Sequence, residues 1–200
     1  MQTEVDLKNL LPAFLEPVLD SQRAFRSILD GMAHPGKVVN LGMDLNVPKP
    51  LHRATAAACL TLLDFETPLW TDLPESSEAL AWLRFHCGCP LVHDPTQASF
   101  AVVTRGETLS SLDAFNIGDQ EFPERSATVM IQVFLLSPGS GKSLKGPGIE
   151  TVERVAVHGL PGDFWMSWRI NRRLYPLGVD LLLTSGTALV AVPRTTEVGD

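Results

Sequence analysis

The order of apolar and polar residues along the chain predicts short strands that alternate with helices. Strands are predicted at continuous or alternating apolar runs, which lie at 37–41, 67–70, 98–104, 127–136, 151–157, 179–184 and 187–193. The last two runs flank Ser185-Gly186, and this arrangement predicts a hairpin.

Helices are predicted where apolar residues recur every three or four positions, and these segments lie at 20–33, 51–63, 76–85, 109–114 and 163–174. Asp20 or Ser21 is the expected N-cap of the first helix, because Pro12 and Pro17 limit any earlier helix to short turns. Strands interleaved with helices, together with the hairpin, indicate an α/β fold with a mixed β-sheet flanked by helices.

The length of 200 residues suits a single domain that covers residues 1–200. Within this domain, we expect residues 1 to about 12 and the tail from about residue 197 to be flexible.

The segment 136–149 follows the strongest strand pattern and is rich in Gly, Pro and Ser. A strand that runs into such a loop is a common phosphate site in α/β proteins, so Gly146 and Gly148 become candidate ligand contacts. The GSGKS run in this segment is not a P-loop, because Leu136 stands where the motif requires its first glycine. Gly146-Pro147-Gly148 also prevents the helix that must follow a P-loop lysine. We expect a tight, exposed turn between two strands instead.

Charge and composition narrow the range of partners. The net charge is −7 and no long basic run occurs, which argues against binding of nucleic acid or anionic lipid. No apolar run approaches the ~20 residues that span a bilayer, and the N-terminus lacks the apolar core of a signal peptide. Three cysteines without framework spacing predict reduced thiols and a cytoplasmic location. With 44% hydrophobic and 20% charged residues, part of the apolar excess is expected at a subunit interface.

Two groups of residues have the composition of a metal or acid–base site. His86-Cys87-Gly88-Cys89, with His93, offers zinc ligands, but the cysteines are one residue apart and no second pair exists. We therefore expect no metal and interpret these cysteines as small buried residues. Asp64 and Glu66, at a helix end, form a candidate carboxylate pair, and the alternative is a turn that Asp64 closes before Pro68.

His34 and the pair Arg194-Thr195 are further candidate ligand contacts. His34 lies where the first helix ends, so it is either a partner of the helix dipole or a ligand contact. Arg194 and Thr195 follow the last strand, and crevices outside strand ends hold ligands in open α/β sheets. Arginine suits phosphate or phosphonate oxygens because its planar fork donates paired hydrogen bonds. The equally weighted alternative is a chain end that emerges into solvent.

A series of short motifs occurs in a defined order along the chain. The motifs are Phe25, Arg26, Leu29 and Met32 before Pro35-Gly36, then LTLLDFETPLW at 60–70, 83–85 before Pro90-Leu91-Val92, Pro123-Glu124 before Ser126-Ala127-Thr128, Leu144 with Gly146-Pro147-Gly148-Ile149, Pro176-Leu177-Gly178-Val179-Asp180, and Pro193-Arg194-Thr195-Thr196. Each motif is weak alone, but the series is specific and covers about Phe14 to Thr196. In this order the chain resembles the PhnH family, the H subunits of the bacterial carbon–phosphorus lyase system.

The resemblance implies a cytoplasmic protein of phosphonate catabolism that assembles with the G, I and J subunits into a core complex. The family is tied to joining an alkylphosphonate to the ribose of ATP with loss of adenine, which yields a ribose 1-phosphonate 5-triphosphate. The implied fold is similar to that of pyridoxal-phosphate-dependent transferases but without the cofactor, and this chain offers no compelling cofactor lysine. No catalytic residue is carried over, because the family has no agreed set.

Two functional hypotheses follow. The first is a non-catalytic subunit for assembly or substrate positioning, which forms a homodimer in isolation and leaves catalysis to partner chains. The second is a free-standing enzyme that acts on a phosphorylated or phosphonate substrate with His34, Asp64 or Glu66, and Arg194. Neither hypothesis includes a metal or an organic cofactor.

Overall fold

A computed structural model describes residues 10–42 and 44–200 of the chain. Its helices are α1 (Pro17–Ala33), α2 (Arg53–Leu62), α3 (Glu78–Cys87) and α4 (Phe164–Arg173). Its strands are β1 (Val38–Asn40), β2 (Leu69–Thr71), β3 (Phe100–Val103), β4 (Thr128–Gln132), β5 (Leu135–Lys145), β6 (Glu153–His158), β7 (Asp180–Ser185), β8 (Ala188–Val192) and β9 (Glu197–Gly199).

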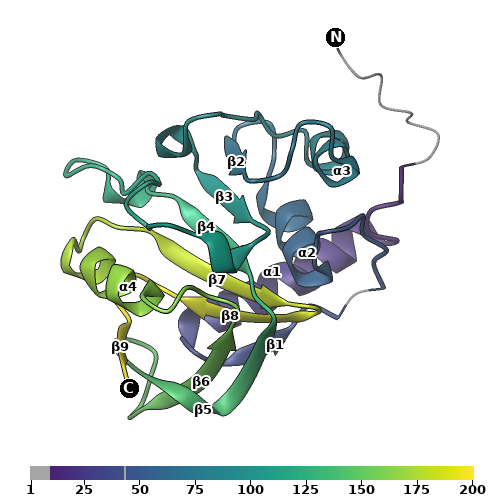
Figure 1. Ribbon diagram of the computed structural model, residues 1–200. Coiled ribbons are helices and arrows are strands. Elements are labelled where there is room, and N and C mark those ends of the chain that lie inside the picture. Colours follow the sequence, from purple (N-terminus) through teal and green to yellow (C-terminus); the bar gives the residue numbers. More distant parts are fainter. Residues whose placement is uncertain (1–9, 43) are drawn as a thin grey trace.

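A six-stranded mixed sheet lies at the centre of the fold, with its strands in the order β1-β8-β7-β4-β3-β2 (Figure 1). The strands β2, β3, β4 and β7 are parallel neighbours, whereas β8 runs antiparallel to β7 and β1 antiparallel to β8. β7 and β8 form the predicted hairpin. A second sheet, in the order β6-β5-β9, is antiparallel throughout. The α/β class with a mixed sheet is therefore confirmed.

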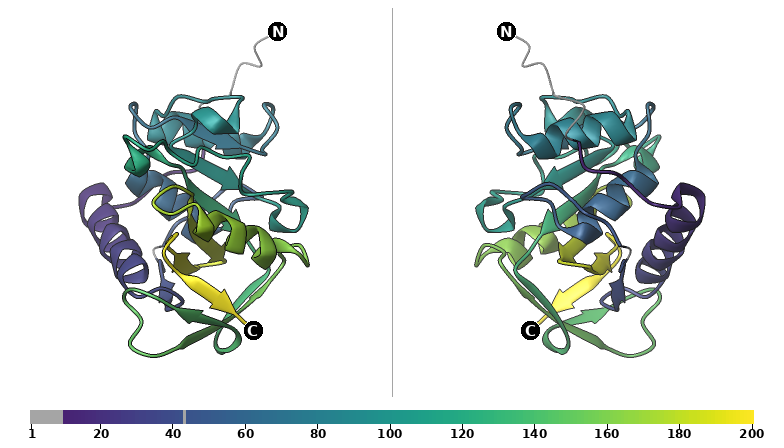
Figure 2. Two further views of the ribbon diagram at one scale, coloured as in Figure 1. Left: turned by 90° about the vertical axis from the view of Figure 1, so that its left-hand side faces the viewer. Right: turned by 90° about the vertical axis from the view of Figure 1, so that its right-hand side faces the viewer.

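The main sheet separates two hydrophobic clusters, because successive strand residues point to opposite faces. On one face, Met130 and Leu182 pack with side chains of α1, α2 and α3. On the other face, Ile131 and Leu183 pack with side chains of α4 and the smaller sheet (Figures 1 and 2). Among the helices that the structure describes, none is both long and apolar enough to cross a bilayer.

The apolar run at 127–136 is divided between the two sheets and does not form one strand as predicted. β4 ends at Gln132, and the Phe134 N–H then donates to the His158 carbonyl of β6 at 2.7 Å. The chain therefore passes from the main sheet to the smaller sheet within two residues. Val129 and Ile131 of β4 and Leu136 of β5 lie in the same hydrophobic cluster, so hydropathy alone could not place the break.

The Gly-rich segment after this break is a bulge inside β5. Pro138 and Lys142 both pair with Val155 of β6, which leaves Gly139–Gly141 outside the ladder. Gly139 and Gly141 have φ angles of 77° and 79°, which residues other than glycine rarely adopt. The predicted turn between two strands is therefore wrong, because the strand continues through the segment to Lys145.

α1 begins earlier than the sequence predicted. Pro17 occupies the first turn, where its missing N–H has no intrahelical partner to lose, and Glu16 is the N-cap residue. The Asp20 carboxylate, expected to cap the helix, instead accepts a hydrogen bond from the Glu16 N–H at 3.1 Å. The apolar residues of α1 divide between two sides of the helix, since Ile28 is buried but Phe25 is 49% exposed.

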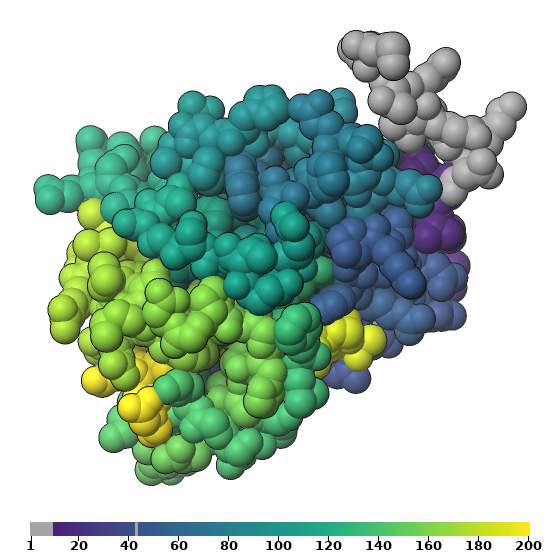
Figure 3. All heavy atoms as spheres, in the orientation of Figure 1, coloured from purple at the N-terminus to yellow at the C-terminus, as the bar shows by residue number. Residues whose placement is uncertain are grey.

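Two further predictions differ from the structure. No helix forms at 109–114, where Leu112 packs directly onto the sheet and its N–H donates to Ser167 Oγ of α4 at 3.2 Å. This segment lies beside α4 on the face shown in Figure 3. The tail from residue 197, expected to be flexible, forms β9, which pairs with β5 and buries Val198.

Candidate functional site

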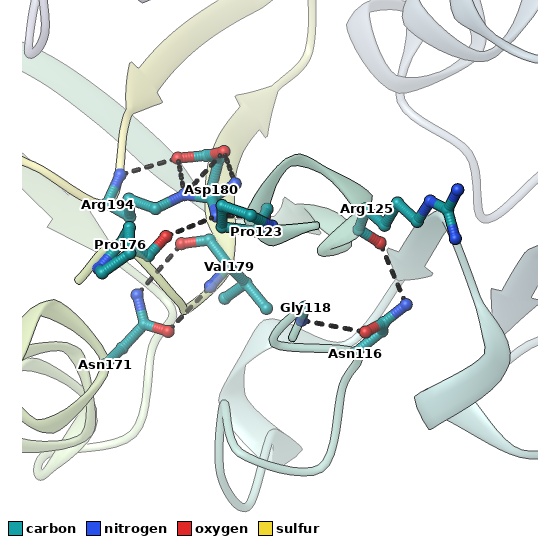
Figure 4. Close-up of polar contacts among 9 residues, drawn as sticks. All are labelled: Asn116, Gly118, Pro123, Arg125, Asn171, Pro176, Val179, Asp180 and Arg194. Atoms are coloured by element: carbon teal, nitrogen blue, oxygen red, sulfur yellow. Dashed lines mark hydrogen bonds and ion pairs between the residues drawn. The ribbon is translucent and has the colours of Figure 1, made fainter. Parts of the chain in front are cut away.

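Arg194 lies at the amino end of the parallel strands, in an ion pair with Asp180 (Figure 4). Arg194 follows β8 and Asp180 opens β7, so the antiparallel hairpin places them side by side. Nε of Arg194 lies 3.2 Å from both carboxylate oxygens, Nη2 contacts Oδ2, and the Arg194 backbone N–H donates to Oδ1 at 2.7 Å. The two side chains are only 14% and 17% exposed, so the pair is shielded from solvent.

The remaining guanidinium donors of Arg194 hold two loops. Nη1 donates to the Pro123 carbonyl at 3.0 Å and to the Pro176 carbonyl at 3.3 Å (Figure 4). Pro123 precedes β4, and Pro176 lies between α4 and β7. Arginine has five N–H groups, and these contacts leave only one N–H of Nη2 for another partner. The guanidinium that the sequence suggested as a ligand contact is thus engaged within the chain.

Two asparagines support the same edge of the sheet. The buried Asn171 of α4 donates to the Val179 carbonyl at 3.0 Å and accepts the Val179 N–H at 2.8 Å (Figure 4). Asn116 donates to the Arg125 carbonyl at 3.0 Å and accepts the Gly118 N–H at 2.9 Å. These bonds fix the loops that carry Pro176 and Pro123, the carbonyl partners of Arg194.

A second cluster of predicted residues lies where the end of α1 meets the turn at 146–148. A Cβ on Gly148, whose φ is +81°, would lie 2.0 Å from the Ala33 carbonyl oxygen. A Cβ on Gly146 would lie 3.2 Å from the Thr195 carbonyl oxygen. The structure therefore brings Gly146, Gly148 and Thr195 together beside the α1 terminus that precedes His34, although these segments are far apart in the sequence.

His34 at this junction is part of a small surface network. Its Nδ1 lies 3.0 Å from an Asp30 carboxylate oxygen and 3.0 Å from the Asp30 carbonyl oxygen. Lys37 Nζ donates to the other Asp30 carboxylate oxygen at 2.8 Å. The hydrogen bond from Lys37, assisted by its charge and by His34, lowers the pKa of Asp30. The interpretation of His34 as a group at the helix C-terminus is consistent with this geometry, because it is the C-cap residue of α1.

Asp64 and Glu66 form a turn between α2 and β2. The Asp64 carboxylate accepts the Glu66 N–H at 2.9 Å, and the Thr67 hydroxyl donates to the Asp64 carbonyl at 2.9 Å. Within the described residues, no hydrogen bond or ion pair connects either carboxylate to His34 or Arg194. The turn interpretation is confirmed, and the four polar side chains of the free-standing enzyme hypothesis do not form one connected set.

Sequence reasoning missed the polar groups at the carboxyl end of the parallel strands. Asp72, which follows β2, accepts the Thr104 N–H at 2.8 Å, the Thr104 hydroxyl at 2.9 Å and the Arg105 N–H at 3.2 Å. Buried Gln132 accepts the His52 N–H and donates to the Thr104 carbonyl at 3.4 Å. In the sequence, Gln132 is the signal that could have revealed this polar network, because it is a strongly polar residue within an apolar run. Thr104 bonds to both Asp72 and Gln132, so these three residues join the ends of the neighbouring strands β2, β3 and β4.

The cysteines and lysines are the side chains whose chemistry suits a metal ion or pyridoxal phosphate. Burial raises the pKa of the Cys87 thiol to about 12, with a further contribution from Cys89. The described part of the chain holds no group of three or more His, Cys, Asp or Glu side chains that could bind a metal ion. Lys142 contacts the Asp200 carboxylate, and Lys37 contacts Asp30.

A Schiff-base lysine requires a desolvated or strongly cationic pocket. None of the lysines that the structure describes is buried; they are Lys37, Lys49, Lys142 and Lys145. The residues present therefore do not fit pyridoxal phosphate.

Comparison with known proteins places the chain in a family. The family described as "Bacterial phosphonate metabolism protein (PhnH)" matches residues 12–199. The chain is 37% identical over 187 residues to the alpha-D-ribose 1-methylphosphonate 5-triphosphate synthase subunit PhnH of Rhizobium meliloti (strain 1021), which covers 93% of this chain and 94% of that protein. It is 30% identical over 178 residues to HtxG of Stutzerimonas stutzeri, described as a candidate C-P lyase subunit, which covers 88% of this chain and 85% of that protein. The chain therefore belongs to the PhnH family of bacterial phosphonate metabolism proteins.

Proposed function

We propose that this chain is a subunit of the complex that forms alpha-D-ribose 1-methylphosphonate 5-triphosphate in bacterial phosphonate breakdown. The observation that carries the proposal is the 37% identity to the Rhizobium meliloti PhnH subunit, which extends over 93% of this chain. A match of that extent covers the sheet, the helices and both polar edges, so it concerns the whole subunit. A shared local motif would cover far less of the chain.

Our proposed role for the subunit is assembly or substrate positioning, with catalysis carried by partner chains. The internal contacts of the candidate residues support this role. Arg194 is bound to Asp180 and two carbonyl oxygens, and the Asp64 carboxylate accepts a hydrogen bond within its own turn. The contact between Gly148 and the end of α1 is closely packed, so we propose that a positioned ligand would touch the outer surface of this junction, where His34 is exposed.

The proposed partners are the G, I and J subunits of the carbon–phosphorus lyase core complex, with a cytoplasmic location and a homodimer in isolation. Exposed apolar side chains on helices support an assembly role, because large apolar surfaces mark interaction sites. Such side chains include Val18 on α1 and Met166 on α4, which are 82% and 58% exposed. We also propose a similarity of fold to the pyridoxal-phosphate-dependent transferases, supported by the mixed sheet with helices on both faces.

Co-expression with the G, I and J subunits tests the proposal. A tag on this chain should capture the other three subunits, and the assembled complex should convert ATP and methylphosphonate to the ribose 1-phosphonate product when the remaining synthase components are supplied. The same preparation without this chain should lose that activity. Failure of the chain to co-purify, together with turnover of methylphosphonate or ATP by the isolated chain, would instead support the free-standing enzyme.

A further inference from the structure

The outer side of α4 is divided along its length into an apolar flank and a basic flank. The inner side of the helix packs on the core through Phe164, Trp168 and Asn171, which are buried. The apolar flank consists of large side chains that are 36–58% exposed, namely Met166, Ile170 and the C-cap residue Leu174. The basic flank consists of exposed arginines, namely Arg169, Arg172 and Arg173. At 100° per residue, the flanks span about 80° and about 100° of the helix surface, and together we call them the α4 outer face.

The apolar flank continues into a shallow hollow between α4 and residues 109–112. Ser167 lines this hollow and lies next to Ile170 on the helix surface, because the two are three residues apart. The basic flank lies toward β9, where Nη2 of Arg172 is 3.9 Å from a carboxylate oxygen of Glu197. Figure 3 shows α4, in yellow-green, at the surface of the molecule. A partner can therefore reach both flanks at once.

The helix dipole explains only part of this arrangement. Cations in the last turn of a helix complement its dipole, which accounts for Arg172 and Arg173. The dipole does not account for Arg169, one turn earlier, or for three large apolar side chains exposed beside the arginines. Within the part of the chain that the structure describes, neither Arg169 nor Arg173 forms an ion pair. The Lys142 hydrogen bond, with a smaller contribution from Arg169, lowers the pKa of Asp200, so this carboxylate is already held by a lysine.

The charge of the α4 outer face indicates the chemistry of its partner. The whole chain has a net charge of −7, whereas this face carries three arginines and no carboxylate, so an acidic partner complements it. A second copy of α4 would bring three more arginines into the contact, and like charges repel. An anionic membrane fits less well, because three apolar side chains bury little area in a bilayer and the chain as a whole is acidic.

The spacing of the apolar flank indicates that the partner segment is a helix. Met166, Ile170 and Leu174 recur every four residues, and such a row is the ridge that packs into the groove of a second helix. The ridge is about 12 Å long at the rise of an α-helix, which is about two turns. A partner helix of two or three turns is therefore long enough to cover it.

We propose that the α4 outer face binds an acidic amphipathic helix of another subunit of the complex. The apolar side of that helix packs on Met166, Ile170 and Leu174, and its Asp or Glu side chains pair with Arg169 and Arg173. The inference rests on the proposed function and adds the surface and the chemistry of one subunit contact. This contact does not involve a second copy of the chain.

The first experiment measures how tightly the tagged chain captures the G, I and J subunits, expressed together. Ile170→Glu places a carboxylate in the apolar flank and Arg173→Glu reverses one charge of the basic flank, so each should weaken capture at least about tenfold. The matched controls are Ile170→Leu, which keeps the flank apolar, and Arg173→Lys, which keeps the charge; both should capture at close to the wild-type level. Circular dichroism checks that all four variants fold, since both side chains are exposed.

The second experiment identifies the partner segment by cross-linking the captured complex with a carbodiimide, which joins an amine to a carboxylate. Arg173→Lys supplies an amine on the basic flank, whereas the wild-type guanidinium does not react. The variant should give a cross-link that the wild type lacks, to an Asp or Glu of another subunit. Mass spectrometry of the linked peptide should show apolar residues at intervals of three or four beside its carboxylates.

The membrane alternative is tested by sedimentation with vesicles made of equal parts of phosphatidylcholine and phosphatidylserine. The wild-type chain should stay in the supernatant. Sedimentation of the wild type with the vesicles, lost in Ile170→Glu, would mean that the α4 outer face binds lipid and that the inference is wrong.

The capture and cross-linking results separate the inference from the proposed function. Wild-type capture together with full capture by Ile170→Glu and Arg173→Glu would overturn the surface and leave the proposed function intact. A loss in Ile170→Glu but not in Arg173→Glu would overturn the acidic chemistry of the partner. A new cross-link to a carboxylate of the same chain alone, or to a peptide without helical apolar spacing, would overturn the partner helix. If the wild type captures none of the three subunits, the proposed function and the inference fail together.

Discussion

Replacing Arg194 by methionine should destabilise the fold strongly, because the substitution leaves a shielded carboxylate without its cation. The variant loses the Nε and Nη2 contacts to Asp180 and the Nη1 contacts to the Pro123 and Pro176 carbonyls. Methionine is similar in length, so packing of the aliphatic stem is largely kept. The effect therefore reports on the polar contacts themselves.

The magnitude follows from the burial of the pair. Removal of one partner from a buried ion pair costs about 3–5 kcal/mol. Asp180 keeps the hydrogen bond from the Arg194 backbone N–H and is 17% exposed, which places the expected loss near the lower end, at about 3 kcal/mol. Arg194→Lys keeps the charge but loses the planar fork, so its expected loss is smaller, about 1–2 kcal/mol.

Urea unfolding followed by circular dichroism, at one fixed protein concentration, measures the effect. With a slope of about 2–3 kcal/mol per molar urea, Arg194→Met should lower the midpoint by about 1 M. Arg172→Met is the control, because the Arg172–Glu197 pair spans 3.9 Å and both side chains are well exposed. The control variant should lose less than about 1 kcal/mol.

The reasoning is refuted if Arg194→Met unfolds at the wild-type midpoint. A calorimetric titration with methylphosphonate or ATP then separates the two roles considered for Arg194. If its guanidinium contacts a ligand, Arg194→Lys should weaken binding without a change in stability, because the paired donors are lost. Equal ligand affinity together with reduced stability would confirm the structural role.

Three further predictions concern other parts of the chain. Gly148→Ala should lower the free energy of unfolding, measured in urea, by roughly 3 kcal/mol or more, because its Cβ would lie 2.0 Å from a carbonyl oxygen. Gly139→Ala is the control: a Cβ at this position meets open space, so the variant should lose only about 1 kcal/mol through backbone strain. Lys37→Met should reduce stability at pH 7, and this loss should shrink as pH falls. The lowered pKa of Asp30 means that the contribution of the pair is present above the unfolded-state pKa and disappears as pH falls through the folded-state pKa. Cys87, whose pKa burial raises to about 12, should resist alkylation at pH 8 until the chain unfolds, and rapid labelling of the native protein would contradict its burial.

The local sequence was sufficient for elements whose signals lie within a few residues. The helix predicted at 76–85 forms as α3, where Ser77 accepts the Ala79 N–H at 3.2 Å and Gly88 ends the helix in the left-handed conformation. The hairpin of β7 and β8 was likewise predicted, because two apolar runs flank Ser185-Gly186. Capping groups and turn residues act on their neighbours in the chain, so their effects can be read from short segments.

Tertiary structure decided the features that depend on distant segments. The break between β4 and β5 arises because Phe134 bonds to His158 of β6, a partner that hydropathy does not identify. The chemistry of Arg194 makes it a candidate phosphonate contact, but its pairing with Asp180 depends on how the hairpin aligns two strand ends. A guanidinium binds a ligand or a neighbouring carboxylate by the same hydrogen bonds, so only the fold determines which partner it meets.

The sequence by itself determined the family, the α/β class and most of the helices and strands, since these follow from residue order and local periodicity. Only the folded chain showed that Gly148 is packed against the end of α1 and that Leu29 faces outward from the same helix. The amino-acid composition of a helix with two apolar faces does not reveal which face packs on the core. The choice between them is made by the small residues Ala24 and Gly31, which allow close approach of α1 to the rest of the fold and leave the larger side chains exposed.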